Sequence, residues 1–539
     1  MNTGTVKQRL KSYKLFSLLI PLKREIESFP YLIYYLKGLI KLRIRKKLSM
    51  SFLYGDGMIL QCEETIHIKG EAMPGEWISV HIAGQEKETY CQSDGCWEVE
   101  LQPLTAGGPY TLMIASRKKK LIYKDVYAGE VWLCSGQSNM VTTIAGYLRH
   151  NKFKEENIFE SKHNMPFRCF CVEVLKPPFN AKWNRWVNRC MNNYHCIRQT
   201  RGWSDCTKET IHSISAIAYF YGKSLSRQLQ KPVGLIVNPL GGTVEHCWIE
   251  RRILQRECPE ILTDWRKNQK VITWMKERVN LNLGKDSQDR NQLHFYYSGY
   301  CFEAFIRPAK DYVIKGVIWF SGEGSAQSDD VELFEKLQEL QIRNWREAWE
   351  KCFPFYYVQL PGINNERESG KGIRFYFADI RNSQYRLLKK LPNLGMAVTC
   401  DQLLFQHSMD HRLVGGRLAR LALYKTYGNK DIMPCGPLPH EAKLRDNFIY
   451  IKFDWSDGLC TKDGDEPKTF EVAGEDRCFF PAKARIEGNE VVLSCPEVPV
   501  PCWVHYAFGE YPVEANLING DGLPAASFEE QIDLIHIKI

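Results

Sequence analysis

The residues best suited to chemistry begin with a serine that follows an apolar run. Val131-Trp132-Leu133 leads into Cys134-Ser135-Gly136-Gln137-Ser138-Asn139-Met140, where a glycine allows a tight turn. A serine in such a turn between a strand and a helix presents its Oγ outward, and free N–H groups at the helix start can stabilise an oxyanion. Ser138 is therefore a candidate nucleophile. The alternative is a plain serine N-cap of a helix.

A glycine turn follows the next apolar run. Val233–Val237 leads into Pro239-Leu240-Gly241-Gly242-Thr243. Paired glycines let a backbone amide approach another group closely, which suits an oxyanion donor and equally suits the entry to a helix. Gly241 and Gly242 are therefore candidate oxyanion residues.

Two later loops supply the remaining parts. One is Trp319-Phe320-Ser321-Gly322-Glu323-Gly324-Ser325, and the other runs from Met396 through Asp401 to His407. A serine, a glycine turn, a late histidine and an aspartate upstream of it are the nucleophile, oxyanion donor, base and orienter of acyl transfer. A lone histidine at a helix start is more often structural, so this interpretation depends on the four loops together.

The elements that must position these loops alternate between strands and helices from residue 128 to 430. The pattern predicts helices at Ile214–Leu229 and Val331–Trp349, each next to apolar strands. Such alternation is typical of an α/β fold with a mostly parallel sheet and helices on both faces. Reactive groups in an open α/β sheet collect at the carboxyl ends of the strands, where all four loops lie.

Two β modules are predicted to flank this domain. Residues 50–127 alternate apolar and polar side chains with turn residues every eight to twelve positions, which indicates a small β-sandwich. Residues 431–539 return to short strands and turns and predict a second β module. The predicted domains are therefore a basic, possibly helical extension at 1–49, β modules at 50–127 and 431–539, and the α/β domain at 128–430.

The charge of the chain is concentrated at one end. The 539 residues carry a net charge of +9, but residues 1–50 hold twelve Lys and Arg against Glu25 and Glu27, a net +10. The remainder, with 60 basic and 61 acidic side chains, has a net charge of −1. A nucleic-acid-binding body needs a basic stripe on its folded surface, so no nucleic-acid partner is expected.

The basic extension does not have the pattern of a secretion signal or of a membrane span. Its apolar runs are short and interrupted by charge well before the roughly 20 residues that crossing a bilayer takes. The 19 cysteines contain no Cys-x-x-Cys spacing and favour reduced thiols over a disulfide framework. We expect a cytoplasmic protein whose residues 1–49 contact an anionic membrane surface reversibly. Packing on its own body or on a partner, or a true start at Met50, are the alternatives.

A family resemblance becomes visible at the loops that carry the candidate residues. Gly129-Glu130-Val131-Trp132-Leu133 with the serine turn resembles the nucleophile block of the sialate O-acetylesterase family, a branch of the SGNH (GDSL-like) hydrolases. The resemblance extends over nearly everything after the extension, including Asn344-Trp345-Arg346 and Phe470-Glu471-Val472-Ala473-Gly474-Glu475-Asp476. It implies an SGNH-like fold, a carboxylic ester hydrolase, an acetylated carbohydrate as substrate, and neither a metal nor an organic cofactor.

The resemblance also implies roles for individual residues. Ser138 would be the nucleophile, His407 the general base and Asp401 its orienter, with Asp410 as the alternative orienter. The candidate oxyanion or substrate-binding residues are Gln137, Gly241, Gly242 and Ser325.

The chain departs from the family pattern in two of these loops. Where the family reads Trp-Tyr-Gln-Gly-Glu-Ser-Asn, this chain has Ser321 in place of the glutamine and Ser325 in place of the asparagine. The family's Gly-Gly-Thr-Pro-Ile-Glu is here Gly-Gly-Thr-Val-Glu-His, with Glu245 in the isoleucine position. Loss of one oxyanion donor typically costs about 10²–10³ in rate. The sequence thus predicts a serine esterase that removes O-acetyl groups from sialic acid or another glycan, and the alternative is a catalytically impaired sugar-binding or scaffold protein.

Overall fold

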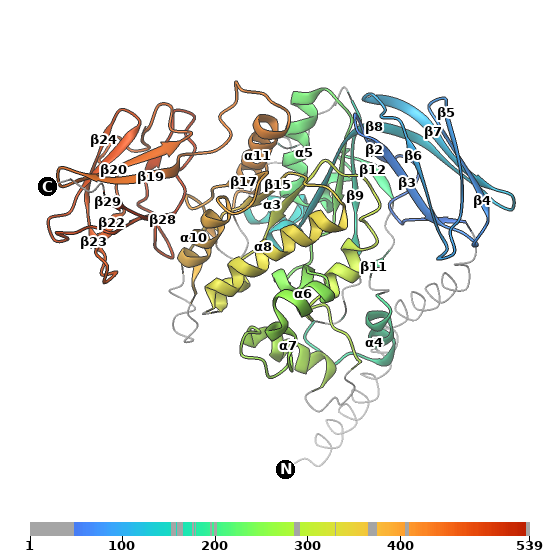
Figure 1. The fold of residues 1–539 in the computed structure, drawn as a ribbon, viewed down its shortest axis with the longest axis horizontal. Helices are drawn as coiled ribbons and strands as arrows, with labels where there is room; N and C mark the ends of the chain where they lie inside the picture. Colours follow the sequence, from blue (N-terminus) through green and yellow to red (C-terminus); the bar gives the residue numbers. More distant parts are fainter. Residues whose placement is uncertain are drawn as a thin grey trace, which may run out of the picture.

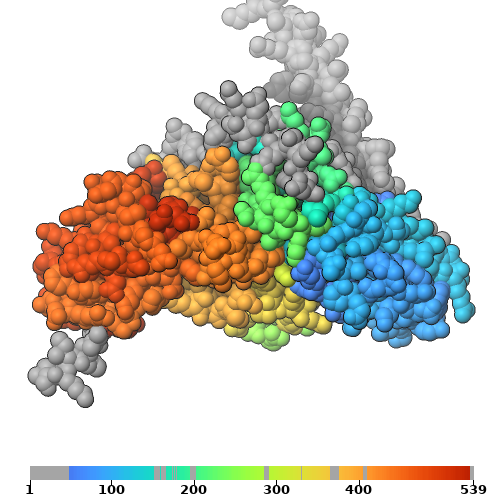
Figure 2. All heavy atoms as spheres, turned by 90° about the horizontal axis from the view of Figure 1, so that it is seen from above, coloured from blue at the N-terminus to red at the C-terminus, as the bar shows by residue number. Residues whose placement is uncertain are grey.

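The computed structural model divides the described chain into three parts along its long axis. A β module near the N-terminus and another at the C-terminus lie at opposite ends, and an α/β region lies between them (Figure 1; Figure 2). The structure describes residues 48–534 except 152–157, 159–164, 175–176, 178, 195–196, 199–201, 285–290, 329, 365–374 and 405–408. Within these residues, no helix has the length and apolar character that crossing a bilayer requires.

Short strands with alternating burial form the N-terminal module. In Cys96–Leu101, for example, every second side chain is buried, as the period-two pattern predicts. Leu48 is buried and Ser49–Met50 pairs with the strand Ile66–Glu71, so the last residues of the predicted extension belong to this module. The strands are β1 (Ser49–Met50), β2 (Ile59–Gln61), β3 (Ile66–Glu71), β4 (Trp77–Ile82), β5 (Gln85–Tyr90), β6 (Cys96–Leu101) and β7 (Gly107–Ser116).

One long strand joins this module to the central sheet. β8 (Lys120–Gly136) pairs with β7 over its first half and with β13 and β14 over its second half. The central strands run in the order β12–β9–β13–β8–β14–β15–β17. They are β9 (Phe167–Cys171), β12 (Trp203–Asp205), β13 (Val233–Val237), β14 (Gly316–Phe320), β15 (Phe355–Val358) and β17 (Leu394–Ala397), with two-residue strands β10 (Glu173–Val174), β11 (Ile197–Arg198), β16 (Gly362–Ile363) and β18 (Leu403–Leu404) nearby.

This sheet is mixed as a whole, whereas the sequence predicts a mostly parallel one. The pairs from β9 to β17 are parallel, but β12 with β9, β4 with β5, β4 with β7, and β7 with β8 are antiparallel. Three of these antiparallel pairs arise because β8 has 17 residues, about 56 Å of extended chain, and leaves the core to pair with β7 of the N-terminal module. The fourth, β12 with β9, lies at the edge of the central strands. The predicted boundary at residues 127 and 128 falls inside this strand.

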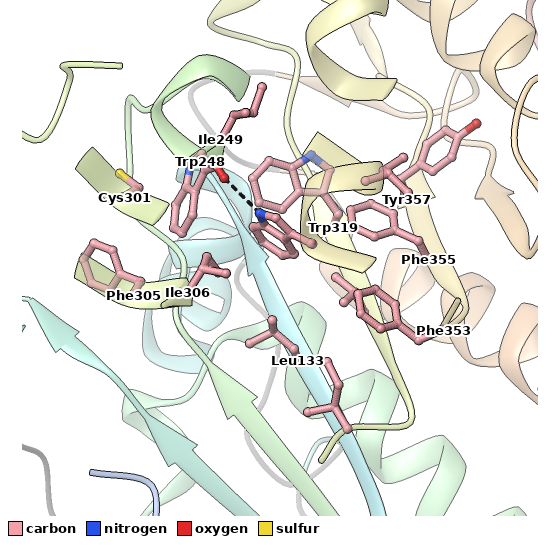
Figure 3. Close-up of a cluster of buried hydrophobic side chains, with 14 of the residues drawn as sticks. Leu133, Trp248, Ile249, Cys301, Phe305, Ile306, Trp319, Phe353, Phe355 and Tyr357 are labelled. Carbon is pink, nitrogen blue, oxygen red and sulfur yellow. Dashed lines mark hydrogen bonds between the residues drawn. The ribbon is translucent and has the colours of Figure 1, made fainter. Parts of the chain in front are cut away.

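Helices cover both faces of the central strands. Alternate side chains of β8 enter two separate cores, Trp132 with α5 (Ala216–Leu229) and α11 (His411–Leu421) in one, and Leu133 with α8 (Val331–Ala348) in the other. The second core contains Trp248 and Trp319 (Figure 3). The predicted helices at 214–229 and 331–349 are confirmed to within two residues. The remaining helical elements are α2 (Ser138–Val141), α3 (Ile144–Asn151), α4 (Arg185–Asn192), α6 (Arg251–Glu257), α7 (Thr273–Leu283), α10 (Phe377–Leu387), η2 (Ile211–Ser213), η3 (Glu245–Trp248), η4 (Pro259–Leu262), η5 (Phe302–Ile306), η6 (Ser325–Gln327) and η7 (Ala422–Thr426).

Two main sheets form the C-terminal module, with strand orders β24–β25–β20–β19–β29 and β23–β22–β26–β28. All their pairs are antiparallel except β19 with β29, which is parallel. Buried polar groups tie the module to the central region: Gln359 Nε2 donates to the carbonyl of Ser527 (2.8 Å), and Arg381 donates to the carbonyl of Gly509. Its strands are β19 (Leu438–Arg445), β20 (Phe448–Asp454), β21 (Cys460–Thr461), β22 (Phe470–Ala473), β23 (Phe480–Pro481), β24 (Lys483–Glu487), β25 (Glu490–Ser494), β26 (Trp503–Tyr506), β27 (Leu517–Ile518), β28 (Phe528–Gln531) and β29 (Asp533–Leu534).

A buried histidine between two carboxylates predicts a pH-dependent stability for this module. His505 lies 2.7 Å from Glu529 through Nε2 and 3.7 Å from Glu471 through Nδ1. Burial alone would lower the pKa of His505, but the two carboxylates outweigh it and raise the pKa above its usual 6.5. Burial opposes the shift of Glu529 as well, yet His505 and Arg477 hold the pKa of that carboxyl below 4.5.

We expect His505→Gln to lower the free energy of unfolding by about 1–2 kcal/mol at pH 5.5, where a charge-assisted bond is lost. A raised histidine pKa contributes stability that is fully present below pH 6.5 and is lost as the pH rises through the folded-state pKa. The difference between parent and variant should therefore be smaller at pH 9. Urea unfolding at both pH values measures it, and a larger difference at pH 9 would contradict the assignment.

Candidate active site

The turn that carries Ser138 is enforced by a close contact between two strands. Gly136, at the end of β8, has a φ of +142°, and a Cβ there would lie 2.1 Å from the carbonyl oxygen of Phe320 in β14. Only glycine fits this position. The amide of Gln137 donates to the same carbonyl (2.9 Å), and the chain then enters α2 at Ser138, which is half-buried. Ser138 thus lies at the start of a helix directly after a sharp turn.

The glycine turn after β13 borders Ser138. A methyl group at Gly241 would lie 3.5 Å from Ser138 Oγ. The amide of Leu240 donates to the carbonyl of Gly136 (2.9 Å), which ties this turn to the serine turn. Gly242 has a φ of +75° and lies against the hydroxyl of Tyr296. Two of the loops singled out by the sequence are therefore adjacent.

A carboxylate from the third loop joins the residues on either side of Ser138. Glu323 accepts hydrogen bonds from Asn139 Nδ2 on Oε1 (2.6 Å) and from Gln137 Nε2 on Oε2. Burial raises the pKa of Glu323, and the two amides oppose that shift. The side chain of Gln137, a predicted oxyanion or substrate-binding residue, is buried and bonded to Glu323. The sequence assigns no role to Glu323, although its place in a glycine-rich loop after an apolar strand is a signal for a functional residue.

A second carboxylate holds the ends of the same loop. Glu245, the first residue of η3, accepts from Ser321 Oγ on Oε1 (2.6 Å) and from Ser325 Oγ on Oε2 (2.5 Å). Glu245 is 1% exposed, and burial raises its pKa. Ser325, a predicted oxyanion residue, therefore directs its single hydroxyl proton to Glu245. The sequence analysis identifies Glu245 only as a departure from the family pattern and assigns it no role.

Of the predicted base and its two candidate orienters, the structure describes only the two aspartates. His407 lies outside the described residues. Asp401 follows the edge strand β17 and forms a bidentate ion pair with Arg417, with both N–O distances 2.7 Å. Asp410 caps α11 by accepting from the amide of Arg412 (3.0 Å) and also accepts from the hydroxyl of Tyr147 (2.9 Å). Both aspartates thus have partners other than a histidine.

Two groups of side chains in the described part of the chain have ligand atoms close enough together to hold a metal ion. They are Cys62 with Glu63 and Glu130, and His67 with Glu98 and Glu100. Neither includes a residue of the loops around Ser138. In the first group, Lys231 Nζ lies 2.7 Å from Glu63 and 3.6 Å from Glu130, so an ammonium group already neutralises these carboxylates.

No family model matches the sequence, but known proteins resemble it along most of the chain. The sialate O-acetylesterase of Mus musculus is 26% identical over 559 residues, covering 92% of this chain and 97% of the mouse protein. That of Homo sapiens is 26% identical over 506 residues, covering 86% and 88%. The crystal structure of a carbohydrate acetylesterase from Xanthomonas citri matches with a TM-score of 0.67 and 25% identity, covering 90% of this chain and 99% of that one. The resemblance seen in the sequence is thus confirmed: the chain is similar to sialate O-acetylesterases over nearly its full length.

Proposed function

We propose that this protein hydrolyses O-acetyl esters on a sugar, with Ser138 as the nucleophile. The observation that carries the proposal is the position of Ser138 on a sharp strand-to-helix turn beside the glycine turn at Gly241. The names of the relatives, sialate O-acetylesterase and carbohydrate acetylesterase, support an acetylated carbohydrate as the substrate.

The proposed reaction is acyl transfer in two steps. Ser138 Oγ attacks the acetyl carbonyl while His407 takes its proton, and the backbone amides of Ser138 and of the Gly241–Gly242 turn stabilise the oxyanion. The sugar hydroxyl leaves with that proton, and an acetyl-serine ester remains. Water then attacks the ester, His407 again serves as the base, and acetate is released. Asp401 or Asp410 would orient His407.

A catalytically impaired protein on the same fold is the second candidate function. It is favoured by the bonds of Ser321 and Ser325 to Glu245, because hydroxyl protons committed to a carboxylate cannot stabilise an oxyanion. Backbone amides alone would then have to supply that stabilisation. The two candidates differ in whether the protein turns over an acetyl ester.

Ser138→Ala should reduce the hydrolysis of p-nitrophenyl acetate and of O-acetylated sialic acid by at least about 10³-fold, because the covalent intermediate cannot form. The free energy of unfolding should change by less than about 1 kcal/mol, since a half-buried turn serine packs little surface. Steady-state kinetics and urea unfolding measure the two effects. Equal activity in parent and variant would overturn the role of Ser138, and a folded parent without activity would favour the impaired protein.

The two glycines of the turn provide a matched pair. Gly241→Ala places a methyl at ordinary contact distance, 3.5 Å from Ser138 Oγ, so it should fold normally and lower kcat/KM by about tenfold through crowding of the acyl group. Gly242→Ala meets the Tyr296 hydroxyl at 2.5 Å with a φ of +75° and should destabilise the protein by about 1–2 kcal/mol. Thermal unfolding and kinetics on both variants distinguish these effects. Full activity in Gly241→Ala would mean that the ester does not approach beside this turn.

We further propose that the basic extension, predicted at residues 1–49, binds an anionic membrane surface from the cytoplasm through residues 1–47, which lie outside the described residues. The support is their charge, because basic residues near an anionic surface contribute about 1 kcal/mol each. Co-sedimentation with phosphatidylserine vesicles should show binding at low salt that is lost at high salt and on deletion of residues 1–47. Binding that survives the deletion would refute the proposal.

A further inference from the structure

The carboxylate of Glu245 connects two of the loops around Ser138. Glu245 begins η3, three residues after Gly242, and its two oxygens accept from Ser321 and Ser325 at the two ends of the third loop. All three side chains are buried, with exposed fractions of 1% for Glu245, 2% for Ser321 and 8% for Ser325. The glycine turn and the 321–325 loop are therefore linked by one side chain.

A carboxylate is costly to bury unless its oxygens are hydrogen-bonded. Burial raises the pKa of Glu245, while the two hydroxyls and His246 favour the charged form. Each hydroxyl bond to a carboxylate is charge-assisted and contributes more than a bond between neutral groups. Both serine hydroxyls are thus oriented toward Glu245 rather than toward the space beside Ser138.

The short helix η3, which begins with Glu245, is anchored by the contacts of Trp248. Trp248, at the end of η3, packs edge-on against Trp319, with ring centroids 5.6 Å apart (Figure 3). Its carbonyl accepts from Trp345 Nε1, and its own Nε1 donates to Thr243 Oγ1, both at 2.9 Å. These indoles are fully buried and hold η3 in place. Glu245, the first residue of η3, therefore gives the 321–325 loop a firmly held hydrogen-bond acceptor.

The middle of the same loop is bonded to the two neighbours of Ser138. Glu323 accepts from Gln137 and Asn139, which flank Ser138. A shift of the loop ends would therefore move the acceptor that orders both neighbours of Ser138. Displacements of about 1 Å at a reacting group can cost 10²-fold in rate.

We propose that Glu245 is a positioning residue that, with Ser321 and Ser325, forms a matched set holding the 321–325 loop and so the neighbours of Ser138 in place. This inference rests on the proposed function of Ser138. The set replaces two amide side chains and one isoleucine of the family pattern: one side chain has become longer and charged where two have become shorter. The carboxylate fills the space and accepts the bonds that the shorter serines make available.

The test is a cycle of substitutions toward the family pattern. Glu245→Ile alone leaves two buried hydroxyls without their acceptor and should lower kcat by about 10- to 100-fold, with KM changed less than about threefold. The double variant Ser321→Gln, Ser325→Asn should lower kcat by a similar factor, because its longer amide side chains would lie against Glu245. The triple variant should recover kcat to within about threefold of the parent, a non-additivity expected of residues in contact.

Glu245→Gln keeps the side-chain volume of glutamate and provides the same test if Glu245→Ile does not fold. One end of an amide cannot accept, so kcat should fall by a smaller factor, about three- to tenfold. The matched control is Glu130→Gln. Glu130 is equally buried and accepts from Gln61 and Tyr427, but it lies eight residues before Ser138. The Glu130→Gln variant should have a lower free energy of unfolding than the parent and the same kcat. A kcat within twofold of the parent in both Glu245 variants, or an equal loss in Glu130→Gln, would overturn the proposal.

Hydrogen exchange separates this inference from the proposed function. Amides of residues 321–328 should exchange faster in Glu245→Gln than in the parent or in Glu130→Gln, and Ser138 should react more slowly with diisopropyl fluorophosphate. If the parent does not hydrolyse acetyl esters, the proposed function fails while the exchange measurement still tests the link. Unchanged exchange at 321–328 would overturn the role of Glu245 even in an active enzyme.

Discussion

The contact between Gly136 and the carbonyl of Phe320 sets the geometry of everything around Ser138. Because the two residues are register partners in a parallel pair, β8 and β14 end at the same level of the sheet. The serine turn and the 321–325 loop therefore begin side by side. The carbonyl of Gly136 also accepts from Leu240, which brings the glycine turn to the same point. Three loops thus converge on one residue pair that tolerates no side chain on its glycine.

Polar side chains above this contact are organised by two carboxylates. Glu323 and Glu245 each use both oxygens to accept from two donors, amides in one case and hydroxyls in the other. A carboxylate with two oxygens can span two donors, so each one fixes a pair of side chains. Buried networks of this kind are sensitive to the loss of any member, since the remaining groups stay desolvated without partners. This sensitivity is the physical basis of the proposed match between Glu245 and the two serines.

The outer parts of the molecule are coupled to the same sheet. β8 continues into the N-terminal module, so the strand that ends two residues before Ser138 is also anchored far from it. At the other edge, Arg381 and Gln359 reach the backbone of the C-terminal module, and Glu510 of that module accepts from the amide at the start of α10 (3.0 Å). The flanking modules therefore constrain both sides of the region that carries the site.

Local patterns in the sequence were enough for several features. Periodicity located α5 and α8, and a glycine between an apolar strand and a serine predicted the turn at Ser138, because both depend on residues close together in the chain. The charge of residues 1–50 is likewise a property of the sequence alone. The mixed character of the sheet could not be predicted, since it depends on how far β8 extends beyond the core.

Long-range contacts decided the rest. The sequence singled out Gln137, Ser325 and Asp401, but their partners Glu323, Glu245 and Arg417 become visible only in the folded chain. Glu245 and Ser325 are 80 positions apart in the sequence but form a hydrogen bond. They come together because Trp248 packs against Trp319, and this contact sets the position of η3 relative to the sheet. The sequence by itself determined which loops carry polar groups suited to acyl transfer. Only the tertiary structure decided which of those groups are bonded to one another, because hydrogen-bond geometry depends on packing between elements distant in the chain.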